Sequence, residues 1–206
     1  MQLLVFVLAY PLLWIISRLP HRLFYAFSDF ICLIVYRLVG YRTKVVRNNL
    51  RLVFPEKPEA ELKSIEKKFY SHLCDTFLEM VKTMSISTEK IKKKYHVINP
   101  DMIHNIEKEK TVLVVCSHYA NWEWGVLAGA PQINHHCIGL YKPLSNKLID
   151  EHFKKNRAQL GMNLVAIKNT KKAFLKSYEK PTCFILLADQ SPSNLKRAIW
   201  LEFLGI

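Results

Sequence analysis

Glycine, proline and acidic side chains are all scarce in this chain. Glycine contributes 6 and proline 9 of its 206 residues, which excludes a collagen-like protein and a proline- and glycine-rich low-complexity protein. Asp and Glu together number 17 against 30 Lys and Arg, so the formal net charge is +13. A surface of this sign attracts polyanions, of which nucleic acids, anionic lipid head groups and acidic carrier proteins are the main classes.

The cysteines form neither a disulfide pattern nor a zinc pattern. Their number is odd, no C-x-x-C spacing occurs, and each lies in an apolar stretch: Cys32, Cys74, Cys116, Cys137 and Cys183. Such usage indicates a folded part that faces a reducing compartment without a disulfide framework. The spacing is also unlike that of a zinc site. We therefore predict no metal ion and no cofactor.

Several motifs that mark large functional classes are missing too. The chain has neither a P-loop nor a G-x-G-x-x-G fingerprint, so the sequence does not indicate nucleotide binding. It also lacks the G-x-S-x-G elbow of serine nucleophiles. The lysines at 92–94 are not interleaved with aromatic residues, as a single-stranded nucleic-acid site would require. We interpret them as a solvated helix end and predict no nucleic-acid partner.

The N-terminal residues are unusually apolar. Met1–Ile16 contains no charge, and as a helix it would be about 24 Å long, which is less than the ~30 Å hydrocarbon core of a bilayer. A second apolar run, Leu23–Val39, is interrupted by Asp29 and Arg37. A cleaved signal peptide fits poorly, because no basic residue precedes the first run. We predict that residues 1–39 form membrane-anchoring helices, which either span the bilayer or embed in it; the alternative is a buried helix of a soluble domain.

Basic residues are concentrated directly after the first apolar run. Residues 18–51 contain one acidic side chain and seven basic ones: Arg18, Arg22, Arg37, Arg42, Lys44, Arg47 and Arg51. A cluster in this position marks the cytoplasmic side of a membrane and attracts anionic lipid. An anionic membrane surface is therefore an expected partner.

Residues 40–206 carry the pattern of an α/β domain. Apolar residues recur every three or four positions in residues 58–82, which predicts a helix. Predicted strands then alternate with predicted helices, which favours a mostly parallel sheet flanked by helices. The nearly all-apolar first strand is expected to be buried. The strands are Thr111–Cys116, His136–Tyr141, Met162–Ile167 and Thr182–Ala188, and the helices are Asn121–Ala130, Ser145–Leu160 and Thr170–Tyr178.

Polar residues follow the first predicted strand in the segment SHYANWEWG, residues 117–125. Ligands of parallel α/β sheets bind just beyond the carboxyl ends of strands, so His118 is a candidate general base. In one continuous helix Glu123 would lie about 140° away. The two can meet only if Glu123 opens a helix capped by Asn121. A carboxylate on one ring nitrogen would leave the other to accept a proton from an attacking hydroxyl.

These residues favour direct attack by an acceptor hydroxyl over an acyl-enzyme, because the chain has no suitably placed serine. A purely structural role for His118 stays open at this point.

Two further segments place polar residues at the same predicted edge of the sheet. Lys142 follows the second strand. Arg157 lies on the apolar stripe of its helix, where it must either reach water or bind an anion; the alternative is a helix-end cation that interacts with the helix dipole. Asp189 and Gln190 follow the last strand, which is a weak signal alone because Asp often ends strands.

Four of these segments, in this order, resemble a known family. SHYANWEWG resembles the H-x4-D/E block of the lysophospholipid acyltransferase superfamily, and most of all its late lipid A biosynthesis acyltransferases, in which Glu replaces the commoner Asp. The segment YKPLSNKLIDEHFKKNRAQLG resembles the second block of that branch, ADQSPS its D-Q block, and EFLGI the start of the next. The basic segment at residues 45–65 is also similar.

The resemblance implies a glycerolphosphate acyltransferase-like fold and an enzyme of the bacterial inner membrane, with its catalytic domain on the cytoplasmic side. The enzyme would move a fatty acyl chain from acyl carrier protein to a hydroxyl of a lipid A precursor. On the matching positions, His118 would be the general base and Glu123 its partner. The substrate-binding residues would be Arg157, which binds acceptor phosphate or steadies developing charge, together with Lys142, Asn121, Asp189 and Gln190.

Two alternatives remain beside this interpretation. The same chemistry could act on another polar lipid, such as an aminoacyl lipid or a glycolipid, or the chain could be a non-catalytic membrane-bound remnant. The family continues beyond the block in which Ile206 falls, so the resemblance implies a chain shortened at its C-terminus, with part of its sheet unpaired.

Overall fold

The computed structural model describes residues 2–105, 110–133, 135–190 and 195–202. Most of the EFLGI segment and the SPS of the D-Q block fall outside these ranges. The chain divides into two compact units: a sheet unit of residues 1–18 and 80–190, and a helical unit of residues 19–79 and 191–206. The sequence instead predicted a domain boundary between residues 39 and 40, from hydropathy and the family resemblance. That boundary stays a prediction.

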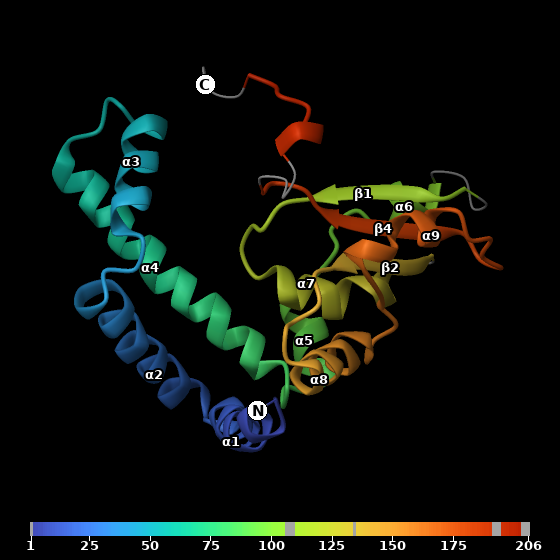
Figure 1. The fold of residues 1–206 in the computed structure, drawn as a ribbon, viewed down its shortest axis with the longest axis horizontal. Coiled ribbons are helices and arrows are strands. Elements are labelled where there is room, and N and C mark those ends of the chain that lie inside the picture. Colours follow the sequence, from blue (N-terminus) through green and yellow to red (C-terminus); the bar gives the residue numbers. More distant parts are fainter. Residues whose placement is uncertain (1, 106–109, 134, 191–194, 203–206) are drawn as a thin grey trace. The chain divides into compact units, whose positions relative to one another are not determined.

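Among the described residues, four parallel strands form one sheet in the order β1-β4-β2-β3 (Figure 1). They are β1 (Val112–Cys116), β2 (His136–Tyr141), β3 (Asn163–Ala166) and β4 (Thr182–Leu187). Each end lies within one residue of its predicted place, so the prediction of a parallel α/β sheet is confirmed. The helices of this unit are α1 (Gln2–Arg18), α5 (Thr88–Lys94), α6 (Pro100–Asn105), α7 (Trp122–Gly129), α8 (Lys147–Ala158) and α9 (Thr170–Phe174).

The two faces of the sheet pack against different helices, because side chains alternate along each strand. Cys137 and Cys183 are register partners on β2 and β4, and both are buried in a cluster with the end of α7. The adjacent Ile138 and Phe184 point to the opposite face, where they pack against Ala173 of α9. The sheet therefore separates the α7 side from the α9 side.

Strand β1 is less buried than its sequence predicted. It lies at an edge of the sheet and, among the described residues, pairs with β4 alone. Leu113 and Val115 are 55% and 65% exposed, although Val114 between them packs into the core on the α7 side. The expectation of a buried strand was wrong for one face, because an apolar composition does not reveal which strand takes the edge.

The predicted cap of α7 is confirmed, and the structure shows which residues begin and end α8. The side-chain oxygen of Asn121 accepts the backbone N–H of Trp124 at 3.0 Å and caps α7. Asn146 caps α8 in the same way. Gly161, which follows α8, has a φ of 94°, a left-handed value that glycine adopts readily. These local contacts fix where the two helices lie next to the sheet.

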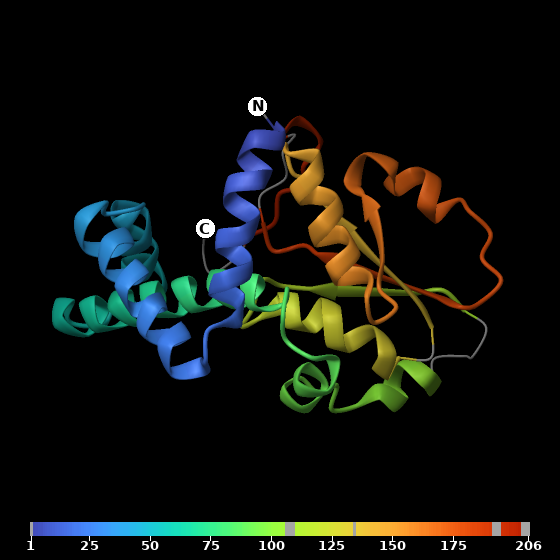
Figure 2. The same ribbon diagram turned by 90° about the horizontal axis from the view of Figure 1, so that it is seen from below.

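Helix α1 belongs to the sheet unit and runs beside α8 (Figure 2). At its first turn, Gln2 donates to the backbone of Ser145 at 3.1 Å, and its own carbonyl accepts from Asn146 at 2.9 Å. At its last turn, Ser17 is fully buried and its carbonyl accepts from Ser85 at 2.6 Å. The helix is therefore fastened to the rest of the sheet unit at both ends.

The helical unit contains α2 (His21–Leu33), a π-helical segment (Ile34–Leu38), α3 (Thr43–Val53), most of α4 (Glu59–Lys82) and a short 3-10 turn (Leu195–Arg197). Helix α4 confirms the prediction made for residues 58–82. Phe24 and Tyr70 are buried, and Ser28 donates to the carboxylate of Asp75 at 2.6 Å. This last contact joins α2 to α4.

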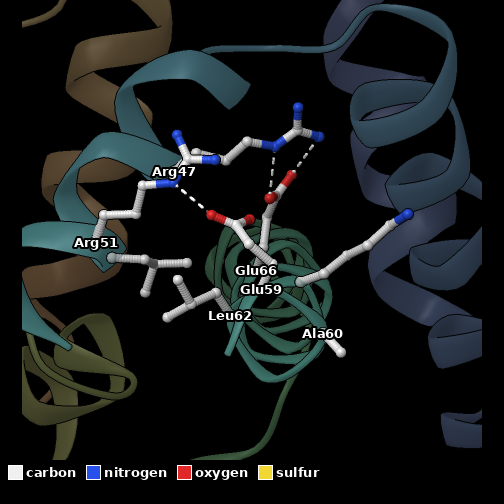
Figure 3. Close-up of a pocket in the computed structure, with 8 residues that line it drawn as sticks. Arg47, Arg51, Glu59, Ala60, Leu62 and Glu66 are labelled. Carbon is white, nitrogen blue, oxygen red and sulfur yellow. Dashed lines mark hydrogen bonds and ion pairs between the residues drawn. The ribbon is translucent and has the colours of Figure 1, made fainter. Parts of the chain in front are cut away.

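Two of the seven basic residues between positions 18 and 51 are held by carboxylates of α4 (Figure 3). Arg47 donates two hydrogen bonds to Glu66, at 2.8 and 3.0 Å, and the Glu66 side chain is only 2% exposed. Arg51 donates one to Glu59 at 2.7 Å, and that pair is mostly exposed. The hydrogen bond to Glu66 raises the pKa of Arg47. Two of the basic residues expected to attract anionic lipid are therefore paired with carboxylates inside the helical unit.

No single helix within the described residues has both the length and the hydropathy needed to cross a bilayer. His21–Leu38 and Thr43–Val53 reach that threshold only as a pair, with a 90° bend between them. Gly40 and Arg42 lie at the bend with φ values of 62° and 54°. The helices expected in residues 1–39 are present, and their attachment to a membrane stays a prediction.

Candidate active site

His118 and Asp189 meet because their strands are neighbours. β1 and β4 pair in parallel with Cys116 opposite Leu187, and the N–H of Ala188 donates to the carbonyl of Cys116 at 2.9 Å. His118 and Asp189 each follow these register partners by two residues. The backbone N–H of His118 donates to Oδ2 of Asp189 at 2.8 Å, and ring Nδ1 lies 2.6 Å from Oδ1. One carboxylate thus holds both the main chain and the ring of His118.

The predicted contact between His118 and Glu123 is not formed in the described part of the chain. Glu123 does lie in the first turn of α7, as expected. Its two oxygens instead accept from Arg157, at 2.8 Å from Nε and 2.6 Å from Nη2. This pairing prediction was wrong because the order of strands in the sheet, which brings Asp189 to His118, cannot be read along the chain. The catalytic role given to Glu123 stays a prediction.

The Glu123–Arg157 pair is largely shielded from water. The side chains are 9% and 20% exposed, and Nη2 of Arg157 also lies 3.9 Å from the sulfur of Met80. Arg157 therefore finds an anion on the apolar stripe of α8, as one of the two sequence interpretations required. A forked arginine–carboxylate pair fixes direction as well as distance, so it sets how α7 and α8 lie relative to each other.

The loop between His118 and α7 has a constrained backbone. Ala120 has a φ of 50°, a left-handed value that is uncommon for a residue with a side chain. The Trp122 ring stands edge-on to the His118 ring, with centroids 5.1 Å apart. Sequence reasoning missed this contact of Trp122, although its place four residues after His118 was a usable signal. Asn121 caps α7 from the same loop.

Gly125, in the segment that follows the first strand, packs closely against Tyr95. A Cβ atom on Gly125 would lie 3.0 Å from the hydroxyl of Tyr95, closer than most side-chain contacts. Any larger residue at this position would require the Tyr95 side chain to shift by a few tenths of an ångström. This contact helps to place the first turn of α7, which carries Glu123.

The His118–Asp189 pair has the chemistry of an oriented base. The hydrogen bond from His118 lowers the pKa of Asp189, so its carboxylate is ionised at neutral pH. If Nδ1 donates its proton to that carboxylate, Nε2 holds the lone pair. The His118 and Asp189 side chains are 25% and 36% exposed, so reactants can reach them. Nε2 can then take a proton from a hydroxyl, while the carboxylate stabilises the imidazolium that forms.

The remaining predicted residues lie at the same edge of the sheet, because parallel strands end together. Lys142 directly follows β2 and is exposed. Gln190 follows Asp189 and is also exposed. Within the described residues, no three His, Cys, Asp or Glu side chains are grouped so that they could hold a metal ion. The substrate-binding roles given to Lys142, Gln190 and Asn121 stay predictions.

Comparison with known proteins gives a family match for most of the chain. The profile of bacterial lipid A biosynthesis acyltransferases matches residues 2–205. The lipid A biosynthesis lauroyltransferase of Escherichia coli (strain K12) is 27% identical to the chain over 139 residues. That alignment covers 67% of this chain and 45% of the lauroyltransferase. The chain thus matches less than half the length of this relative.

Proposed function

Since the chain belongs to the bacterial lipid A biosynthesis acyltransferase family, we propose that it transfers a fatty acyl chain from acyl carrier protein to a hydroxyl of a lipid A precursor. The observation that carries the proposal is the His118 ring, which Asp189 holds at the carboxyl edge of the sheet. The similar lauroyltransferase, named for lipid A biosynthesis, supports the class of acceptor. The net charge of +13 suits an acidic donor protein and a phosphorylated acceptor.

His118 acts as the general base in the proposed reaction. Its Nε2 takes the proton of the acceptor hydroxyl while that oxygen attacks the thioester carbonyl of the donor. The tetrahedral intermediate collapses, the carbon–sulfur bond breaks, and the imidazolium returns the proton to the leaving sulfur. The products are an ester on the lipid and a free thiol on the carrier. Asp189 keeps Nδ1 protonated throughout and stabilises the imidazolium.

Arg157 and Glu123 support the site in this proposal. Glu123 occupies two of the five N–H donors of the guanidinium. The other donors can bind a phosphate of the acceptor, or the charge that develops in the transition state. In this proposal Glu123 orients Arg157 and the first turn of α7. This role replaces the direct contact with His118 that was inferred from the sequence.

We place the reaction at the cytoplasmic face of the bacterial inner membrane, with residues 1–39 embedded in the bilayer. Support comes from the uncharged run Met1–Ile16 and from the basic residues that follow it. The bent pair His21–Leu38 and Thr43–Val53 adds apolar length.

A direct assay tests the function. Membranes that contain the chain are mixed with acyl-loaded carrier protein and a lipid A precursor, and the lipid is analysed by mass spectrometry. We expect one added acyl chain with the wild type and ~10²–10⁴-fold less with His118→Ala. Lys171→Ala on α9, which is exposed on the other side of the sheet, is the control and should match the wild type.

Other outcomes separate the alternatives. Acylation of an aminoacyl lipid or another glycolipid in place of the lipid A precursor would transfer the same chemistry to that acceptor. Equal activity of His118→Ala and wild type would refute the base assignment. A folded, membrane-bound chain that acylates none of these acceptors would contradict the proposal and favour a non-catalytic remnant.

A further inference from the structure

Helix α1 presents a broad apolar surface that the sheet unit leaves uncovered. One side of the helix packs towards α8, where Tyr10 meets the His152 ring edge-on with centroids 4.6 Å apart and Ser17 is fully buried. The rest of the helix exposes eight large apolar side chains, each 41–68% exposed: Leu3, Leu4, Val5, Val7, Leu8, Leu12, Trp14 and Ile15. A contiguous patch of this kind marks an interaction surface.

A groove continues this surface onto α8. Its volume is about 470 Å³, and apolar side chains from both helices contribute to its lining: Phe6, Leu148 and Ala158. Lys154 and Lys155 also line it, with Glu151 and His152 as the other polar residues. Lys154 and Glu151 form a loose ion pair, 3.9 Å apart, whose side chains are 42% and 73% exposed. A pair this exposed leaves the lysine able to meet another anion.

The end of α1 adds a second interfacial feature. The guanidinium of Arg18 lies 4.4 Å from the centre of the Trp14 ring. Tryptophan and basic side chains are enriched where the apolar interior of a bilayer gives way to its head groups. The α1–α8 pair therefore combines exposed apolar side chains, an aromatic ring and cations.

We propose that this α1–α8 face, defined by the exposed apolar residues of α1 and the groove lysines Lys154 and Lys155, docks the sheet unit onto an anionic phospholipid bilayer. α1 lies in the plane of the interface, its outer side chains enter the acyl region, and the two lysines meet lipid phosphates. The inference deepens the proposed membrane attachment and does not depend on acyl transfer. It assigns to the membrane a part of the chain beyond residue 39.

A bilayer suits this face better than a protein does. The outer side of α1 carries no charged or hydrogen-bonding side chain between residues 3 and 9, whereas protein interfaces include polar groups around their apolar centre. The hydrogen bonds of Gln2 and Ser17 hold both ends of α1 along the sheet unit. A helix held in this way at its side is arranged to lie on a membrane and not to cross it alone.

The docking has a consequence for the site. α8 carries Lys154 and Lys155 on its groove side and Arg157 two residues further on. Arg157 holds Glu123 from this same helix. In this proposal, the helix that supports the candidate active site is also the one that meets lipid head groups. A lipid acceptor could then reach the site while its acyl chains stay in the bilayer.

Vesicle binding of the full chain tests the proposal. Partitioning is measured by co-flotation with phosphatidylcholine vesicles and with mixed phosphatidylcholine–phosphatidylglycerol vesicles. Lys154→Gln with Lys155→Gln should weaken binding to the mixed vesicles about 30-fold, since each lysine near an anionic surface contributes about fivefold (~1 kcal/mol). Binding to phosphatidylcholine alone should not change. The matched control, Lys171→Gln with Lys172→Gln on the opposite α9 side, should behave as wild type on both vesicles.

A second pair of variants tests the apolar part. Leu4→Gln with Leu8→Gln should lower binding to both kinds of vesicle by at least tenfold, because these side chains leave water on docking. Leu175→Gln, at a leucine that is 75% exposed beyond α9, is the control and should have no effect.

The outcomes distinguish this inference from the proposed membrane attachment. If the wild type binds vesicles but neither variant pair differs from its control, the α1–α8 docking is overturned and the attachment through other residues stands. If the wild type binds no vesicle, both fail. If Leu4→Gln with Leu8→Gln abolishes self-association and leaves vesicle binding intact, a second copy of the chain covers this face and the proposal is overturned.

Discussion

Asp189 binds His118 through both of its oxygens, and the hydrogen bond from His118 lowers its pKa. A proton therefore binds this carboxyl less readily in the folded chain than in the unfolded chain. The stabilisation of the folded chain by this ionised carboxylate is fully present above the ordinary pKa of aspartic acid, about 3.9. It is lost as pH falls through the lower pKa of the folded state.

Because folding lowers the pKa of Asp189, the effect of Asp189→Asn on stability should depend on pH. Above the ordinary pKa of Asp the variant should unfold at lower urea concentration than the wild type. The difference should shrink and disappear as pH falls below that value, because the wild type then loses the same charged contact. Urea midpoints at a series of pH values measure it, with Glu179→Gln as an exposed control. A difference that grows in acid would contradict the assignment.

The Glu123–Arg157 pair gives a second prediction at the residue scale. Arg157→Ala should cost about 3 kcal/mol in the free energy of unfolding, because it leaves a shielded carboxylate without its partner. The double change with Glu123→Ala should cost less than the sum of the single changes. The free energy of unfolding of Arg157→Lys should lie between those of the wild type and Arg157→Ala, since lysine keeps the positive charge but cannot donate two parallel hydrogen bonds to the carboxylate. Urea denaturation of the four variants and the wild type measures these differences, and additive effects would show that the two residues do not interact.

The residues of the site could be found from the sequence, but their partners could not. His118 and Asp189 each lie two residues beyond the end of a strand, and this position was visible along the chain. The sequence did not show that β1 and β4 are neighbours in the sheet, because α7, β2, α8, β3 and α9 lie between them along the chain. The carboxylate nearest in sequence, Glu123, was therefore paired with the wrong residue.

At the scale of elements, local chemistry was more informative than composition. Asn121 was predicted to cap α7, and each end of that helix lies within one residue of its predicted place. α9 ends at Phe174 and not at the predicted Tyr178. Tyr178 lies beyond the helix, where its side chain packs against the core on that face and its hydroxyl donates to the carbonyl of Ala173 at 3.1 Å.

The two arginines that α3 presents to α4 allow a matched test (Figure 3). Arg47→Ala should lower the urea midpoint of the helical unit clearly, because Glu66 is buried and would lose its charged partner. Arg51→Ala should have a much smaller effect, since both members of the Arg51–Glu59 pair lie mostly in water. Circular dichroism during urea titration provides the comparison, and equal midpoints for the two variants would contradict it.

On the scale of the whole molecule, hydropathy located the apolar segments but not their structural attachment. Residues 1–18 belong with the sheet, whereas residues 19–39 belong with α3 and α4. The sequence treated both as one anchor, because they share composition and a short linker. Only long-range contacts, such as that of Ser17 with Ser85, separate them.

We expect the full chain to fractionate with membranes and to stay there in a high-salt wash. Screening weakens contacts between cations and lipid phosphates, but it does not release the apolar side chains of α1 and α2 from the bilayer. Ultracentrifugation of lysates at low and high salt, followed by detergent extraction, measures this. Recovery of intact protein in the low-salt supernatant without detergent would contradict the expectation.

The fastening of α1 also affects the order of events during synthesis. Gln2 bonds Asn146, 144 residues later in the chain, and Ser17 bonds Ser85, 68 residues later. At translation rates of about 5–20 residues per second, roughly 7–29 seconds separate the two ends of the first contact. During that time the ribosome holds a nascent apolar segment whose native partner does not yet exist. We expect this interval to favour early capture of α1 by the membrane, before the sheet has folded.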